Sequence, residues 1–283
     1  MLVVLSLAAL GLFSISAAFN RDDREALTSP AAKTARSTSA VQGTSMPVIV
    51  ELFTSEGCSS CPPADQLLSR LDKEQPVPGA NVIALSQHVD YWNQLSWRDP
   101  YSSAQFSARQ SSYAEAFGRD GVYTPQMVVD GRLEFVGSNA TKAREAITEA
   151  ASSPKAKVQI EITPNTETRE SGTVQFTVRV EDIPAITAGD IAEVLVAITE
   201  SDLSSSVARG ENAGRNLRHT AVVRQLATIG SISKTKDEAS FTAAPVVNIL
   251  NKWRRDKLRA VVIVQERVSR HVLGAQAIEL GAK

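Results

Sequence analysis

The sequence predicts a chain of two folded parts: an α/β part with the element order β-α-β-α-β-β-α, and a mostly antiparallel β-sandwich after it. Two observations predict this class. Between residues 47 and 153, short apolar runs of strand length alternate with helical patterns, as in β-α-β units. From residue 154 to residue 283, strand-like segments often alternate apolar and polar residues, and turn signals separate them, as in antiparallel sandwiches.

The N-terminal segment predicts export. The first 19 residues contain no charged side chain and are dominated by Leu, Val and Ala, and the small residues Ser16–Ala18 follow the apolar run. This pattern is typical of a secretory signal peptide, so we expect residues 1–19 to be cleaved and the protein to be periplasmic or secreted. No Lys or Arg precedes the run, and an uncleaved membrane anchor is therefore the alternative. Otherwise we expect no transmembrane span. Residues 20–46, rich in Ser, Thr and Ala, predict a flexible linker.

The α/β part, residues 47–153, begins with a buried strand. Residues 48–53 are apolar and rich in β-branched side chains, which favours a strand covered on both faces. Pro62 and Pro63 then suit the first turn of a helix, where the missing N–H would be unpaired in any case. The further elements expected in this part are strands at 82–86, 124–129 and 133–136 and helices at 101–117 and 139–151.

The sandwich part, residues 154–283, is predicted from alternation. Residues 174–180 alternate strictly between apolar and polar side chains, which indicates a strand with one buried face. The segment 210–215 is rich in turn formers and predicts a long hairpin loop. The strand-like segments are 158–162, 174–180, 192–198, 221–226, 239–242, 260–265 and 275–280.

Net charge and cysteine content limit the classes of function that the protein can have. The formal net charge is −1, so no basic excess indicates nucleic acid as a partner. The chain has 2 cysteines, and both lie in one Cys-x-x-Cys segment, Cys58 and Cys61. A loop this short contributes little to stability, and export would place the pair in an oxidising compartment. The spacing therefore favours chemistry over a scaffolding role.

Cys58 and Cys61 lie between the first predicted strand and the first predicted helix. A thiolate at a helix N-terminus faces free N–H groups and the positive end of the helix dipole, which lower its pKa. We expect Cys58 to be exposed and to be the attacking nucleophile, with Cys61 as the less exposed resolving thiol. The pattern predicts a thiol–disulfide oxidoreductase that acts on protein or small thiols, with this disulfide and no other cofactor.

Topology predicts which segments join the cysteines. The first two strands should be parallel and the third antiparallel, so the segments at residues 88–92 and 123–125 should reach the same sheet edge. We expect a cis bond before Pro125, so that the main chain of Thr124 can bind an extended substrate. Tyr91 and Trp92 are candidates for an apolar substrate platform, although packing under the loop would explain them equally well.

Two further residues are candidates for proton transfer. His88 follows the second strand and could exchange protons near the cysteines, or be an ordinary hydrogen-bonded histidine. Glu51 lies in the buried first strand, where an unpaired carboxylate should have a raised pKa and could accept a proton from Cys61. A salt-bridged or surface position for Glu51 is the alternative.

Two other functions stay open. Cys58, Cys61 and His88 could form a copper or zinc site, as in a metal-delivery module, although a structural zinc site needs four ligands. The sandwich could also bind a partner protein without catalysis.

Four segments together resemble an uncharacterised bacterial family of secreted, thioredoxin-like proteins that is known only as a domain of unknown function. They are residues 50–65, 88–92, 123–127 and 210–215, within a match of about residues 47–280. The resemblance implies a thioredoxin-like fold for the first part and a bacterial source, and it supplies no activity. Gly57 stands where thioredoxins have a tryptophan, and Ser59-Ser60 replaces Gly-Pro. Both departures argue against reductase-like behaviour and against recognition by thioredoxin reductase.

Overall fold

The computed structural model describes residues 45–163, 172–233 and 240–281. The predicted signal peptide and residues 20–44 of the predicted linker lie outside the described residues. The residues that are described belong to one compact unit, residues 42–283. Within these ranges, no helix is both long and apolar enough to cross a membrane.

The first part has the expected order of elements. Helices and strands alternate as β-α-β-α-β-β-α between residues 46 and 151. Strand β1 pairs with β2 in parallel and with β3 antiparallel, and β3 pairs with β4 antiparallel. In chain order these elements are β1 (Met46–Thr54), α1 (Pro62–Glu74), β2 (Ala80–His88), α2 (Ala104–Ala116), β3 (Gln126–Val129), β4 (Leu133–Val136) and α3 (Ala140–Ala151).

Strands dominate the rest of the chain, with a single 3₁₀ turn, η1 (Arg255–Lys257), among its described residues. The predicted strand at 221–226 continues to residue 232, and part of the predicted strand at 239–242 lies outside the described residues. The strands are β5 (Lys157–Ile162), β6 (Thr173–Glu181), β7 (Ala192–Glu200), β8 (Leu203–Ser206), β9 (Asn216–His219), β10 (Val222–Ile232), β11 (Phe241–Ala243), β12 (Val246–Asn248), β13 (Leu258–Glu266) and β14 (Val272–Glu279).

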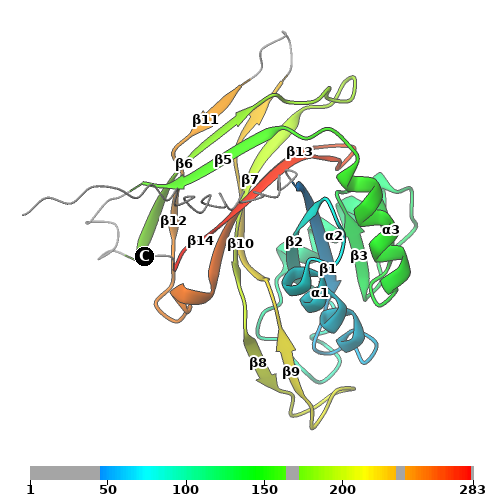
Figure 1. Ribbon diagram of the computed structural model, residues 1–283. Coiled ribbons are helices and arrows are strands. Elements are labelled where there is room, and N and C mark those ends of the chain that lie inside the picture. Colours follow the sequence, from blue (N-terminus) through cyan, green and yellow to red (C-terminus); the bar gives the residue numbers. More distant parts are fainter. Residues whose placement is uncertain (1–44, 164–171, 234–239, 282–283) are drawn as a thin grey trace, which may run out of the picture. The chain divides into compact units, whose positions relative to one another are not determined.

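The predicted fold class, a thioredoxin-like α/β domain followed by a separate β-sandwich, is wrong. One mixed sheet of eight strands, in the order β14-β13-β7-β10-β2-β1-β3-β4, takes strands from both expected parts (Figure 1). The junction is at β2, where Val222 of β10 pairs with Ser86, and the Ser86 N–H donates to the Ala221 carbonyl at 2.8 Å. The physical reason is that β2 would otherwise end the sheet with unpaired main-chain groups, and local periodicity does not encode which distant strand pairs with them.

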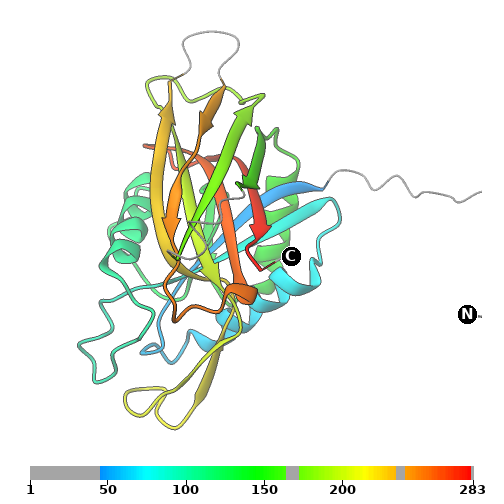
Figure 2. The ribbon, with the colours of Figure 1, turned by 90° about the vertical axis from the view of Figure 1, so that its left-hand side faces the viewer.

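A smaller sheet packs on the second half of the large one. Its order is β11-β6-β12, and β5 also pairs with β6. Phe176 and Val178 of β6 bury their side chains in a core shared with Val194 of β7 and Val262 of β13. Figure 2 is seen from the side of the smaller sheet, which lies in front of strands of the large sheet.

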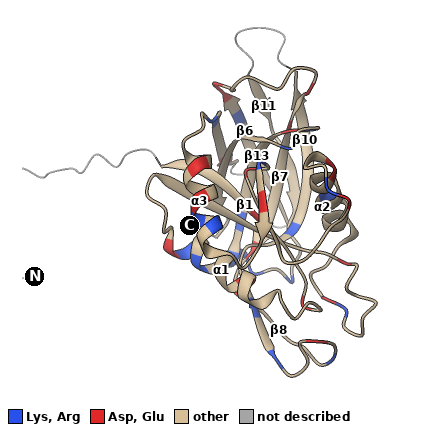
Figure 3. Cartoon of the chain, turned by 90° about the vertical axis from the view of Figure 1, so that its right-hand side faces the viewer, with Lys and Arg blue, Asp and Glu red and all other residues tan. Residues whose placement is uncertain are grey.

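The helices cover the first half of the large sheet on both faces. Val50 of β1 packs with Leu68 of α1 and Ile147 of α3, whereas its neighbour Ile49 packs with Phe106 of α2. Figure 3 shows α2 on the opposite side of β1 from α1 and α3. This two-sided cover explains the continuous apolar run that predicted β1, because successive side chains of a strand point to opposite faces.

Strands β8 and β9 form a hairpin of their own that extends beyond the large sheet (Figure 1). The hairpin lies beside α1, to which β9 makes contacts. Residues 207–215 connect the two strands. This hairpin positions the candidate site described next.

Candidate functional site

Cys58 and Cys61 form a disulfide between the end of β1 and the start of α1. Cys61 is the N-cap of α1, and its carbonyl accepts hydrogen bonds from the N–H groups of Ala64 at 2.9 Å and Asp65 at 3.1 Å. The two prolines that follow fit the first turn, as expected from the sequence. The Cys58 sulfur lies 3.3 Å from the Ser60 hydroxyl oxygen. The pair therefore stands at a helix N-terminus, where a thiolate would be stabilised.

Both cysteines are fully buried, and the expected exposure of Cys58 is not observed. The loop 207–215, which we call the cover loop, is hydrogen-bonded to the cysteine segment. The side-chain amide of Asn212 donates to the carbonyl oxygens of Glu56 and Cys58, both at 2.9 Å. The Ser59 N–H donates to the Glu211 carboxylate at 2.9 Å. The sequence predicted this segment as a hairpin loop, and its contact with the cysteines was not foreseen because it comes from another half of the chain.

Trp92 connects the cysteine segment to the Thr124-Pro125 segment. The peptide bond before Pro125 is cis, as the sequence predicted. The Trp92 indole N–H donates to the Thr124 hydroxyl oxygen at 2.8 Å, and a Cβ atom at position 57 would lie 3.2 Å from the Trp92 Cβ. The pairing of Phe53 with Gln126 brings the start of β3 beside the end of β1. The structure thus brings these three segments together at one sheet edge.

Tyr91 is directed towards α2. Its hydroxyl donates to the Gln110 side-chain oxygen at 3.1 Å, and its ring packs beside Phe53 and Tyr113. Burial raises the pKa of Tyr91 above the ordinary value. These contacts are those of a packing residue, one of the two interpretations that the sequence left open.

His88 lies in a buried ion pair. Its Nδ1 is 2.7 Å from an Asp99 carboxylate oxygen, and both side chains are inaccessible to solvent. Burial alone would raise the pKa of Asp99, but the adjacent His88 and main-chain N–H donors from Glu56 and Tyr101 hold it below the ordinary value. The Nε2 atom of His88 is buried without a hydrogen-bond partner in the described part of the chain.

A second buried pair, Glu56 with His219, lies beside the first. One Glu56 carboxylate oxygen is 3.0 Å from His219 Nε2, and the other accepts from the Trp97 indole N–H at 2.8 Å. The rings of His88 and His219 meet edge to face with centroids 4.7 Å apart. Sequence reasoning missed Glu56, Asp99 and His219. A charge two residues before Cys58, and the scarcity of histidine (3 in the chain), were the available signals.

Asp65 adds a buried acid one helical turn after Cys61. It is 9% exposed, and its Oδ1 atom has no hydrogen-bond partner among the described residues. Burial raises the pKa of Asp65 to about 7. The cysteine segment is therefore backed by several buried ionisable groups, which is an arrangement common at functional sites and also found in structural ion-pair networks.

Glu51 is part of a different network. Its carboxylate accepts two hydrogen bonds from Arg109, at 2.7 and 2.9 Å, and others from Tyr113 and Gln87. Burial alone would raise the pKa of Glu51, but the charge and hydrogen bonds of Arg109 lower it below the ordinary value. The expected raised pKa is therefore wrong, and the salt-bridged alternative describes this residue. Arg109 also bonds Gln265 of β13 at 2.9 Å, so the network joins α2 to both halves of the sheet.

The residues that the structure describes contain no group of three or more His, Cys, Asp and Glu side chains that could hold a metal ion. The copper or zinc site formed by Cys58, Cys61 and His88 stays a prediction, which titration of the reduced protein with Cu(I) tests.

Residues 49–265 match the model of the family described as "Protein of unknown function (DUF1223)", and the chain belongs to this family. The chain is similar to the crystal structure of protein AGR_C_4864 from Agrobacterium tumefaciens, with 27% identity and a TM-score of 0.61 over 83% of this chain and 95% of that one. It also shares a fold with HBP35 of Porphyromonas gingivalis, at 15% identity and a TM-score of 0.60 over 83% of this chain and 76% of that one. A search of curated proteins finds no match.

Proposed function

We propose that this protein is an exported thiol–disulfide oxidoreductase whose reactive group is the Cys58–Cys61 pair. The observation that carries the proposal is the position of these cysteines, bonded to each other at the N-terminal end of α1. In the reduced form, the main-chain N–H groups of the first helical turn and the helix dipole would stabilise a thiolate there. A pair separated by two residues can open and close without a rearrangement of the core.

The exchange takes place in two balanced steps. A substrate thiolate attacks the Cys58 sulfur, the Cys58–Cys61 bond breaks, and Cys61 leaves as a thiolate that takes up a proton. A second thiolate of the substrate then attacks the substrate sulfur of this mixed disulfide, and Cys58 leaves as a thiolate. The substrate dithiol is oxidised to a disulfide by two electrons, and the cysteine pair is reduced. The reverse steps reduce a substrate disulfide.

The surroundings of the pair support this chemistry. Trp92 and Thr124 lie beside the cysteine segment, as a surface for a substrate chain would require. The buried pairs behind the segment supply groups that can hold protons. Because both cysteines are fully buried, we expect a protein substrate to reach Cys58 only after a local opening. The cover loop, which is bonded to the Cys58 carbonyl, is the segment that we expect to move.

The test is refolding of scrambled ribonuclease and reduction of insulin by the wild type and by Cys58→Ser. We expect activity in the wild type and background rates in the variant. Cys61→Ser is the matched variant. With a disulfide substrate such as insulin we expect its Cys58 thiolate to attack one substrate sulfur, release the other as a thiolate, and remain in a mixed disulfide that mass spectrometry detects. Equal background rates for the wild type and Cys58→Ser, without a mixed disulfide in Cys61→Ser, would contradict the proposal.

Export is the second part of the proposal, and the apolar segment of residues 1–19 supports it. Fractionation of bacterial cells followed by N-terminal sequencing tests it. We expect the protein outside the cytoplasm with a new N-terminus between residues 17 and 21. Recovery of the uncleaved chain from the cytoplasm would contradict it.

A further inference from the structure

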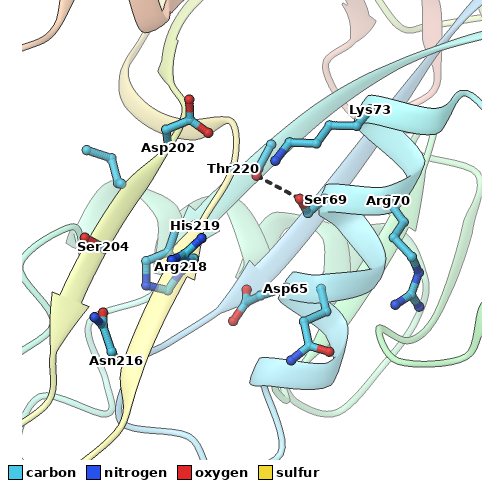
Figure 4. A pocket seen from close by; sticks show the side chains of 12 residues that line it. Asp65, Ser69, Arg70, Lys73, Asp202, Ser204, Asn216, Arg218, His219 and Thr220 are labelled. Atoms are coloured by element: carbon cyan, nitrogen blue, oxygen red, sulfur yellow. Dashed lines mark hydrogen bonds between the residues drawn. The ribbon is translucent and has the colours of Figure 1, made fainter.

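A cavity of about 550 Å³ lies between α1 and the β8–β9 hairpin (Figure 4). A neighbouring cavity of about 210 Å³ extends along α1 to Pro62, the residue after Cys61. The larger cavity has the size of small-molecule sites in other proteins, which enclose about 300–1,000 Å³. Its lining is polar and comes from segments more than a hundred residues apart in the sequence, for example Ser69 and Lys73 of α1 and Ser204, Arg218 and Thr220 of the hairpin.

Exposed cations line the cavity without a direct ion-pair or hydrogen-bond partner among the described residues. Lys73 and Arg218 form no ion pair or side-chain hydrogen bond within the described ranges of the chain. Figure 4 shows Lys73 reaching from α1 towards the hairpin, whereas Arg70 points away from it. Of the two acids in the lining, Asp202 is already paired with Lys257 at 3.1 Å. Lys73 also lies within electrostatic range of Asp202, whose pKa is lowered by the Lys257 hydrogen bond and by the Lys73 charge. Lys73 and Arg218 are nevertheless cations of the lining that have no direct ion-pair contact in the described part of the chain.

A buried polar atom in the same lining also lacks a partner. Asp65 is 9% exposed, its side chain points from α1 towards β9 in Figure 4, and its Oδ1 atom makes no hydrogen bond among the described residues. His219, also in the lining, has a buried Nδ1 atom with no partner in the same part of the chain. Buried polar groups in folded proteins are normally satisfied, so these atoms point to a ligand or ordered water.

We propose that this cavity binds a small polar anion, a molecule that carries a carboxylate or a phosphate group. Lys73 and Arg218 hold the anionic group, because an ammonium and a guanidinium both donate charge-assisted hydrogen bonds to such oxygens. Asp65 accepts a hydrogen bond from a hydroxyl or amino group elsewhere on the same molecule. The Ser69 and Thr220 hydroxyls, 3.1 Å apart, join α1 to β9 at the cavity wall. The proposal does not depend on the redox activity of the cysteines.

The experiment is a titration of the ¹⁵N-labelled full chain followed by NMR, with two probes at constant ionic strength. Sulfate represents the tetrahedral phosphate class, and malonate represents the carboxylate class. We expect saturable shifts of amides in residues 65–73 and 216–220 with at least one probe. The probe that saturates identifies the ligand class. If neither probe produces saturable shifts there, the proposal is wrong.

Two double variants locate the site. Lys73→Gln with Arg218→Gln should weaken binding about ten-fold or more, since each removes a charge-assisted contact. Both side chains lack partners, so the amide spectrum without ligand should stay that of a folded chain. The matched control is Arg144→Gln with Lys252→Gln, which removes the same charge from exposed positions on α3 and in the loop before η1. An equal loss of affinity in both double variants would show nonspecific attraction and overturn the proposal.

Discussion

The side-chain amide of Asn212 lies 2.9 Å from the carbonyl oxygen of Cys58, although 154 residues separate the two in sequence. Asn212 is fully buried, and its second amide hydrogen bond goes to the carbonyl of Glu56. One side chain therefore fixes the main chain on both sides of Gly57 and attaches the cover loop to the cysteines.

Loss of this amide should loosen the cover loop. In Asn212→Ala the two carbonyls stay buried without their donor, which costs about 1–3 kcal/mol. If about 1 kcal/mol of this falls on local opening, the open population rises about five-fold, and so should the rate at which dithiothreitol reduces the disulfide. Asn139→Ala, which removes the side-chain N-cap of α3 and no hydrogen bond to the cysteine segment, is the matched control and should leave that rate unchanged. An unchanged rate in Asn212→Ala would mean that the cover loop does not limit access.

The space beside Gly57 is already filled. In Gly57→Ala the new Cβ would lie 3.2 Å from the Trp92 Cβ, so Trp92 must shift. We expect a loss of about 1 kcal/mol in the free energy of unfolding by urea, together with a changed tryptophan fluorescence spectrum. Gly121→Ala meets nothing within 4 Å and should change neither quantity. Stability equal to the wild type in Gly57→Ala would show that Trp92 moves freely. This contact also explains why no large residue precedes Cys58.

Asp65 should make stability depend on pH. Its pKa is raised from 3.8 to about 7 by burial, so the folded state binds a proton that the unfolded state has released between these values. The ionised group therefore destabilises the fold increasingly as the pH rises from about 4 to about 7, by at most about 4 kcal/mol. The groups that face it are Thr54, Glu56, Asp99 and His219.

The test compares Asp65→Asn with the wild type by urea denaturation from about pH 4 to about pH 8. We expect the variant to gain up to about 4 kcal/mol relative to the wild type across this range, with most of the gain below about pH 7. Asp120→Asn, in the exposed loop after α2, is the control and should show no such trend. A constant difference between Asp65→Asn and the wild type would contradict the raised pKa.

The Glu51–Arg109 pair should be essential to stability. Arg109→Met leaves the Glu51 carboxylate buried without its cation, which should cost about 3 to 5 kcal/mol. The cost should fall at lower pH, because without Arg109 burial raises the pKa of Glu51 and a protonated acid is tolerated there. Arg144→Met on the surface of α3 is the control. A loss below about 1 kcal/mol for Arg109→Met would mean that water replaces the guanidinium.

Local structure could be predicted from the sequence, and long-range pairing could not. The apolar run of β1, the prolines at the start of α1 and the proline at 125 each act on their own neighbours, so they are visible in a short window. The pairing of Ser86 with Val222 is not, because any exposed strand edge can accept many partners. This one contact is what makes the predicted two-part fold wrong.

The candidate site was also predictable where it depends on local sequence, and not where it depends on distant residues. The spacing of Cys58 and Cys61 and the antiparallel direction of β3 were enough to place Thr124 near the cysteines. Buried Cys58 is bonded through its carbonyl to Asn212, 154 residues away, and the lowered pKa of Glu51 depends on Arg109, 58 residues away. In both cases the partner residue is distant in the sequence, and the order of elements along the chain does not reveal it. Residue type alone therefore predicted the wrong exposure for Cys58 and the wrong direction for the pKa shift of Glu51.

The separation in sequence between Cys58 and Asn212 of the cover loop sets an order of events during synthesis. Ribosomes add about 5–20 residues per second, so Asn212 is made about 8 to 30 s after Cys58. Throughout that interval the cysteine segment lacks the two hydrogen bonds from Asn212, which form only once the hairpin has been made. The newly made chain and the finished protein thus hold the same two cysteines in different surroundings, first without and then with the loop that is made later.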